Sequence, residues 1–126
     1  MKKRHLTIIV IVTVALVVGS VILVLLNNRP TYEVVKVYPH DPNAFTQGLV
    51  IEDDVLYEGT GMYGSSTLRR VELETGEVTQ LYSLPNYLFG EGITILDDKI
   101  IQLTWLNQTG FVYDKHSFEL LQEFNY

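Results

Sequence analysis

The sequence predicts an all-β fold, an incomplete β-propeller, behind one N-terminal transmembrane helix. Three observations lead to this prediction. A run of 21 residues without a charge, Leu6–Leu26, follows a basic start. The rest of the chain consists of short runs of β-branched and aromatic residues separated by turn-forming residues. Two blocks in this part resemble each other at an offset of 44 residues, a period typical of four-stranded propeller blades.

The N-terminal segment is predicted to have three parts: a basic cytoplasmic tip at 1–5, a transmembrane signal anchor at 6–26 and a linker at 27–31. A bilayer core needs about 20 apolar residues as a helix, and the charge-free run meets that length. It ends without the small residues that a signal peptidase requires, which favours an uncleaved anchor over a cleaved signal peptide. The basic tip indicates that the remainder lies outside the cytoplasm, membrane-anchored, or secreted if the leader is cleaved.

The first β-type run, Tyr32–Tyr38, is rich in β-branched and aromatic residues and stops at Pro39. We expect it to be a strand, because this composition is typical of strands and proline ends them. It precedes the first repeated block. It would therefore suit the outer strand of a last blade whose other strands are not in this chain.

The repeat gives blade one at about 44–87 and blade two at about 88–126, within a β region at 32–126. Each block is predicted to form four antiparallel strands, because further β-type runs follow its first hairpin, at 66–73, 77–84, 110–114 and 118–124. Aspartate tolerates the left-handed backbone of tight turns, so the pairs Asp53-Asp54 and Asp97-Asp98 are predicted hairpin tips. A small β-sandwich with accidental similarity is the alternative. Because propellers have about 4–8 blades, we expect the chain to be the front part of a larger protein.

Composition excludes several kinds of site. The chain has no cysteine, which removes disulfides, zinc-thiolate centres and cysteine nucleophiles. Its three histidines match no metal-binding spacing, so we expect neither a metal nor another cofactor. Three of the nine Lys and Arg residues lie in the leader, which leaves six against 15 Asp and Glu, a net charge of −9. Such an acidic region disfavours nucleic acid as a partner.

The candidate site lies at the starts of the two blades. Gln47 and Glu91 are equivalent in the repeat, so both are expected at one mouth of the propeller channel. Phe45 and Phe89 precede them, and Trp105, the only tryptophan, ends a later strand run. A carboxyl group near aromatic rings is partly desolvated, which raises its pKa and suits a proton shuttle. A solvated loop carboxylate and aromatic rings that only pack between blades are the alternatives.

Five motifs follow one another in the β region: AFTQGL at 44–49, GTGMYGSSTLR at 59–69, FGEGIT at 89–94, QLTW at 102–105 and GFVYD at 110–114. Together they resemble the plant and bacterial type of glutaminyl-peptide cyclotransferase. The resemblance covers nearly all of residues 32–126, in order and with similar spacing. It implies a five-bladed β-propeller without a catalytic metal, here represented by two blades.

The resemblance implies an aminoacyltransferase that converts N-terminal glutamine of peptides or proteins to pyroglutamate and releases ammonia. It assigns proton transfer to Glu91 and a hydrogen bond near the substrate to Gln47. Phe45 and Trp105 would form walls of the pocket. A lysine and an asparagine that the family carries in later blades have no counterpart here. A non-enzymatic exported module that binds peptides or proteins is therefore the second hypothesis, and a truncated, inactive relative the third.

Overall fold

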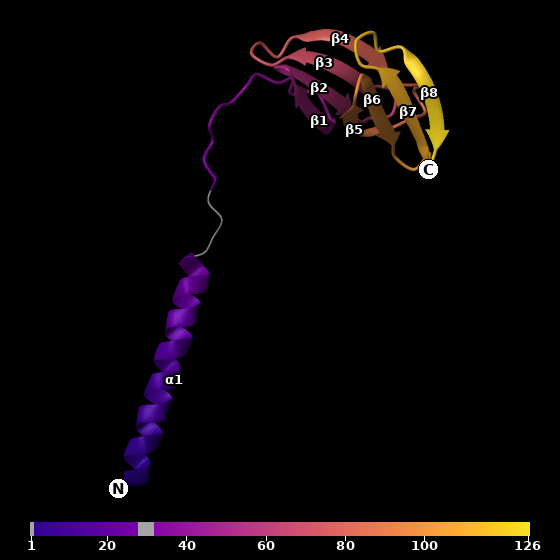
Figure 1. Ribbon diagram of the computed structural model, residues 1–126. Helices are drawn as coiled ribbons and strands as arrows, with labels where there is room; N and C mark the ends of the chain where they lie inside the picture. Colours follow the sequence, from indigo (N-terminus) through magenta and orange to yellow (C-terminus); the bar gives the residue numbers. More distant parts are fainter. Residues whose placement is uncertain (1, 28–31) are drawn as a thin grey trace. The chain divides into compact units, whose positions relative to one another are not determined.

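The computed structural model describes residues 2–27 and 32–126 (Figure 1). The chain forms two compact units, Met1–Lys36 and Val37–Tyr126, and the second contains eight strands. The expected all-β architecture is confirmed for this second unit. The predicted linker is 27–31. Its first residue, Asn27, is the last residue of the helix, and 28–31 lie outside the described residues.

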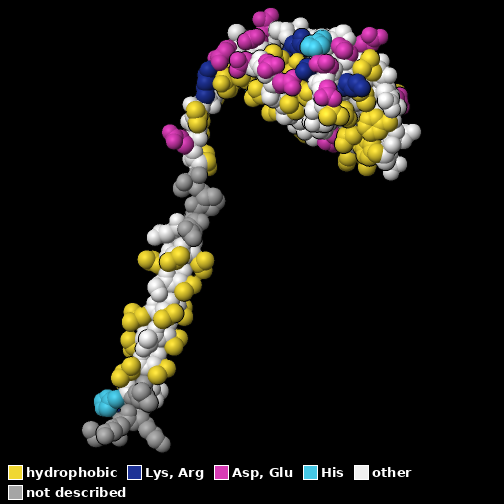
Figure 2. Space-filling model, in the orientation of Figure 1, with side chains coloured by type: hydrophobic (Ala, Val, Ile, Leu, Met, Phe, Trp, Pro, Cys, Tyr) yellow, Lys and Arg dark blue, Asp and Glu magenta, His cyan; other side chains and the backbone are white. Residues whose placement is uncertain are grey.

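The helix α1, Lys2–Asn27, carries no charged residue from Leu6 onward, and hydrophobic side chains lie along the face drawn in Figure 2. The hydroxyl groups of Thr13 and Ser20, in the middle of the helix, form hydrogen bonds with backbone carbonyls of the same helix. Thr13 Oγ1 donates to Ile9 O at 2.6 Å, and Ser20 Oγ donates to Val17 O at 2.9 Å. Hydroxyls bonded in this way leave no polar group that requires water. Thr7–Asn27 has the length and composition of a membrane-crossing helix, which a signal sequence shares.

Tyr32–Tyr38 does not form the expected strand. The segment has strand composition, but a strand also needs a neighbouring strand for its backbone hydrogen bonds. None of the strands in the described part of the chain pairs with it. The composition is therefore typical of a strand, but no partner strand lies in the described part of the chain.

The second unit contains two four-stranded antiparallel sheets, each with its strands in chain order (Figure 1). The strands of the first sheet are β1 Thr46–Glu52, β2 Val55–Thr60, β3 Thr67–Glu72 and β4 Val78–Ser83. Those of the second are β5 Gly90–Leu96, β6 Lys99–Thr104, β7 Thr109–Asp114 and β8 Leu120–Asn125. The two sheets are the structural form of the sequence repeat.

The predicted hairpin tips are confirmed. Asp53 and Asp54 have φ angles of 51° and 60°, and Asp97 has 53°. In the first hairpin, two left-handed residues give the turn whose twist matches the strands it joins, whereas in the second hairpin Asp97 is left-handed and Asp98 is not. The hairpins between β3 and β4 and between β7 and β8 also contain left-handed residues, at Gly76 and Phe118.

The core lies between the two sheets. It comprises inward-facing residues of β2, β3, β6 and β7, together with apolar residues of the connections: Tyr57, Leu68, Leu84, Leu88, Ile100, Phe111, Tyr113 and Phe118. Strand β5 contacts both β1 and β2, so the first strands of the sheets run next to each other. An alternation of apolar and polar residues along a strand places one face in such a core.

Glycine allows these first strands to approach closely. A Cβ at Gly48 of β1 would lie 2.6 Å from the backbone nitrogen of Ile93 in β5. At Gly61, just after β2, it would lie 2.5 Å from the carbonyl oxygen of Gly90. Both neighbours are backbone atoms, so no side-chain rotation makes room. Residues without a side chain are therefore required where the two sheets meet.

Two long polar side chains are fully buried at equivalent positions of the repeat. Glu58 of β2 is 1% exposed and Gln102 of β6 is fully enclosed. Gln102 faces the first sheet, where its Nε2 donates to Thr67 O at 3.4 Å. Its Oε1 has no hydrogen-bond partner among the described residues.

Candidate active site

A β-bulge lies at each of the two predicted polar site residues. Thr46 pairs with Thr60 and Gly48 with Gly59, so Gln47 and Gly48 together oppose one residue. The second sheet repeats this arrangement, because the register between β5 and β6 shifts between Gly90 and Ile93, around Glu91. Bulges redirect side chains and occur frequently next to active sites. Gln47 and Glu91 thus occupy equivalent irregular positions on adjacent strands.

Phe89 is the centre of an aromatic cluster at this end of the sheets. The centre of its ring lies 6.0 Å from the ring centre of Phe45, 5.5 Å from that of Tyr63 and 5.5 Å from that of Trp105. All three pairs are in edge-to-face arrangements. Such arrangements are the preferred ones for aromatic pairs. The three outer rings are each about half exposed. They can therefore pack against Phe89 and also contact a ligand, so packing and binding do not exclude each other here.

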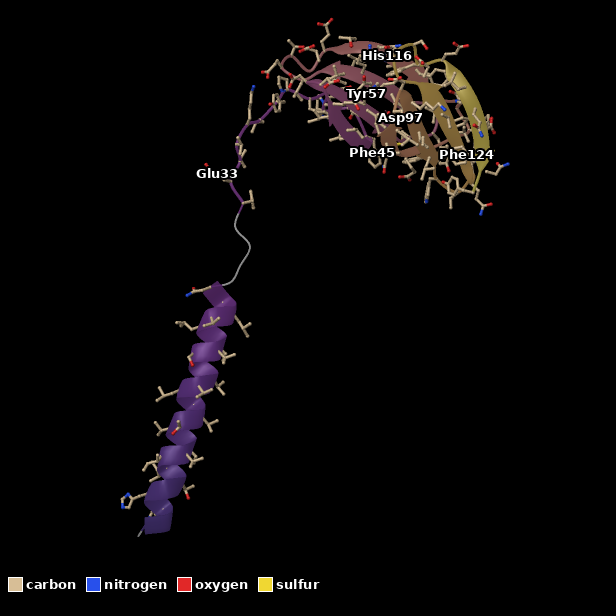
Figure 3. All side chains as sticks on the ribbon, in the orientation of Figure 1. Glu33, Phe45, Tyr57, Asp97, His116 and Phe124 are labelled. Carbon is tan, nitrogen blue, oxygen red and sulfur yellow. The ribbon has the colours of Figure 1, made fainter. Side chains whose placement is uncertain are left out.

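The backbone positions the cluster in the same way in both sheets. Gly61 N donates to Phe45 O at 2.9 Å, and Trp105 N donates to Phe89 O at 2.9 Å. These bonds join the residue before the first strand to the residue after the second strand of each sheet. In Figure 3, Phe45 lies at the opposite end of the unit from His116, which belongs to the turn between β7 and β8.

Glu91 and Gln47 lie next to this cluster. Glu91 follows Phe89 by two residues, and its side chain is partly buried. Gln47 Cγ and the Phe89 ring both face Gly61, since a Cβ there would contact both. Neither the Glu91 carboxylate nor the Gln47 amide has a recorded hydrogen-bond or ion-pair partner within residues 2–27 and 32–126. Both groups are therefore available to an incoming ligand.

Sequence reasoning missed a buried network beside Thr46. Glu58 Oε1 accepts a hydrogen bond from Thr46 Oγ1 at 2.6 Å and lies 2.9 Å from His40 Nε2. Arg69 lies 3.8 Å from the other Glu58 oxygen and donates to Asp41 at 3.0 Å. Charge-assisted hydrogen bonds satisfy a buried carboxylate, which would otherwise be costly to desolvate. The network fixes the start of β1, immediately before Gln47.

The pKa of Asp41 is lowered. The main cause is the backbone N–H of Asn43, and the second is the hydrogen bond from Arg69. Both favour the ionised form of the Asp41 carboxyl group.

The only signal in the sequence for this buried network was Glu58 itself, a charged residue between apolar neighbours in a strand. This pattern indicates an inward-facing carboxylate.

An ion pair joins the two sheets at the end away from the aromatic cluster. Lys115 Nζ, in the turn after β7, donates to Glu52 Oε2 at 2.6 Å. This hydrogen bond raises the pKa of Lys115. Arg70 donates to Lys115 O at 3.0 Å, and its guanidinium lies 5.5 Å from the centre of the Tyr57 ring. The sheets are thus linked at this end as well as at the bulges.

No group of three His, Cys, Asp or Glu residues in the described parts of the chain could hold a metal ion. What the bulges bring together is a carboxylate, an amide and a set of aromatic rings. A carboxylate can carry a proton, an amide can donate and accept hydrogen bonds, and the rings can hold the apolar part of a small ligand. This set of groups suits acid–base chemistry on a small ligand with an apolar part.

The fold and site define an all-β repeat protein whose candidate site is shared by two neighbouring sheets. Residues 8–126 match the sequence model of the family described as glutamine cyclotransferase. The chain therefore belongs to the glutamine cyclotransferase family.

Two relatives illustrate this membership. The glutaminyl-peptide cyclotransferase of Arabidopsis thaliana is 46% identical over 95 residues, which are 75% of this chain and 30% of the relative. The crystal structure of Myxococcus xanthus glutaminyl cyclase superposes with a TM-score of 0.67 at 32% identity, covering 75% of this chain and 39% of that one. The chain thus spans less than half the length of either relative.

Proposed function

We propose that this chain carries part of a glutaminyl-peptide cyclotransferase site that converts N-terminal glutamine to pyroglutamate. The observation that supports the proposal most is the pair of equivalent bulges, with Glu91 and Gln47 beside one aromatic cluster. Family membership and the names of both relatives point to the same reaction.

The reaction exchanges one carbon–nitrogen bond for another. The free α-amine of the substrate attacks the δ-carbon of its own side-chain amide and forms the lactam nitrogen–carbon bond. The bond from that carbon to the amide nitrogen then breaks, and ammonia leaves. One proton must move from the attacking amine to the leaving nitrogen, so no net proton is gained or lost.

Glu91 is proposed to carry this proton. A carboxylate within reach of both nitrogens can accept the proton from the first and deliver it to the second. The absence of a partner for Glu91 among the described residues supports this role, because a carboxylate held in an ion pair is a poorer base. Gln47 is proposed to hydrogen-bond the substrate, and Phe45 and Trp105 to contact its apolar part.

The two sheets are proposed to be neighbouring blades of a propeller, with blade one at about 44–87 and blade two at about 88–126. The contact of β5 with β1 and β2 supports this arrangement, because the first strands of blades lie around the axis. We also propose that α1 is a signal anchor and that the sheets lie outside the cytoplasm, as the basic residues at its start favour.

The test is incubation of the detergent-solubilised full chain with a glutamine-initiated peptide, followed by mass spectrometry. We expect loss of ammonia with the wild type and not with Glu91→Gln. Glu123→Gln, on the exposed part of β8, serves as the matched control and keeps activity. Peptide binding without ammonia loss in all three proteins would instead favour the non-enzymatic binding module. Activity that a chelator abolishes and zinc restores would also contradict the proposal.

A further inference from the structure

The hydroxyl of Ser66 lies in the interior, between the two sheets. Ser66 immediately precedes β3 and is 2% exposed. It ends the loop that connects β2 to β3, which also contains Tyr63 of the aromatic cluster. In the sequence it begins a predicted strand run, 66–73, and no separate role was predicted for its side chain.

Ser66 Oγ contacts backbone groups from both sheets. It accepts hydrogen bonds from Met62 N and from Gly90 N, each at 2.9 Å. It lies 2.8 Å from Met62 O and 3.3 Å from Leu88 O, to which its one hydrogen can be donated. A hydroxyl has one donor and two acceptor positions, so this environment uses its full capacity.

These partners flank the residues of the candidate site. Gly90 lies between Phe89 and Glu91 and is the last regularly paired residue before the bulge in β5. Met62 precedes Tyr63, whose ring packs on Phe89. One buried hydroxyl therefore connects the backbone of the proposed proton carrier to the loop that supports the aromatic cluster.

The bond to Gly90 matters because β5 is an edge strand of its sheet, so a backbone N–H that points away from β6 has no acceptor within the sheet. A backbone N–H that is buried without a partner is costly, so an alternative acceptor is needed. Ser66 Oγ supplies that acceptor from the neighbouring sheet. The orientation of the Phe89–Glu91 backbone is thereby fixed by a residue outside its own sheet.

We infer that Ser66 is a positioning residue for Glu91, acting through the Gly90 amide. This inference rests on the proposed function, because it concerns the geometry of the same site. Reacting groups that are misplaced by about 1 Å can lose about 100-fold in rate. Removal of the hydroxyl should therefore lower turnover more than it lowers substrate binding.

The test compares Ser66→Ala with Ser65→Ala in the full chain. Ser65 is the adjacent, exposed serine, and only its backbone makes a recorded hydrogen bond, which alanine keeps. We expect Ser66→Ala to lower kcat at least about 10-fold, with KM within about two-fold of the wild type. Hydrogen–deuterium exchange should become faster at residues 89–91 and stay unchanged in β7.

Three results would overturn the inference. The first is a kcat and an exchange rate at 89–91 equal to those of Ser65→Ala. The second is uniformly faster exchange over the whole sheet unit, which would indicate a general structural role. The third is a loss confined to KM. If neither the wild type nor any variant shows turnover, the two sheets do not suffice for the proposed reaction. The exchange data alone then decide whether Ser66 holds the Phe89–Glu91 segment.

Discussion

Alanine at Gly48 should separate the first strands of the two sheets. Its Cβ would lie 2.6 Å from Ile93 N and 3.0 Å from Gly92 Cα, whereas ordinary contacts begin at 3.4 Å. Relief requires a shift of 3.4 − 2.6 = 0.8 Å between the backbones of β1 and β5. Overpacking costs about 1–3 kcal/mol, and we expect about 2–3 kcal/mol here because only backbone atoms are in contact.

The repeat supplies a matched control at Gly92. This glycine is equivalent to Gly48, but a Cβ at this position meets nothing within 4 Å among the described residues. Its φ angle does not lie in the left-handed region. Gly92→Ala should therefore be neutral, or stabilising by up to about 1 kcal/mol through the reduced freedom of the unfolded chain.

The assay is thermal unfolding of the detergent-solubilised full chain, followed by the fluorescence of Trp105. In a domain of this size, about 4–8 °C of Tm corresponds to 1 kcal/mol. We expect Gly48→Ala to lower Tm by about 10–20 °C and Gly92→Ala to leave it unchanged or slightly raised. Equal melting temperatures for the two variants would refute the close approach of β1 and β5.

Three further predictions concern the groups around the site. Glu58→Ala should destabilise the protein by about 1–3 kcal/mol, because Thr46 and His40 lose a buried hydrogen-bond partner. Urea unfolding measures this loss, and an unchanged free energy of unfolding would contradict the prediction. The lowered pKa of Asp41 adds stability that is present above its unfolded pKa and is lost as pH falls through the folded pKa. Asp41→Asn should therefore flatten the acid limb of a plot of Tm against pH, and an unchanged limb would argue against the Arg69 contact. Phe89→Ala removes the centre of the aromatic cluster and should shift the emission of Trp105 to longer wavelength, as fluorescence spectra would show; an unchanged spectrum would place Trp105 outside the cluster.

The fold was predictable where it depends on local chemistry. The repeat and the aspartate pairs define where each sheet begins and turns, because tight hairpins select residues that accept a left-handed backbone. Tyr32–Tyr38 was the exception, since strand composition does not reveal whether a partner strand is present. Local sequence thus predicted turns better than it predicted pairing.

The site was predictable only in part. Equivalence in the repeat predicted Gln47 and Glu91 at the same end of neighbouring strands. The bulges were not predictable, because a bulge depends on how many residues of one strand face the other. The contacts of Glu58 with His40 and of Ser66 with Gly90 join residues 18 and 24 positions apart, which no local pattern reveals.

The two sheets carry acid and amide at the same two positions in opposite order. The first has Gln47 at its bulge and Glu58 in its second strand, whereas the second has Glu91 and Gln102. Glutamate and glutamine differ in one heteroatom, and their codons differ in one base. Two exchanges between glutamate and glutamine therefore interconvert the polar pairs of the two sheets. Such exchanges move the charge between the bulge and the second strand without changing the length of a side chain.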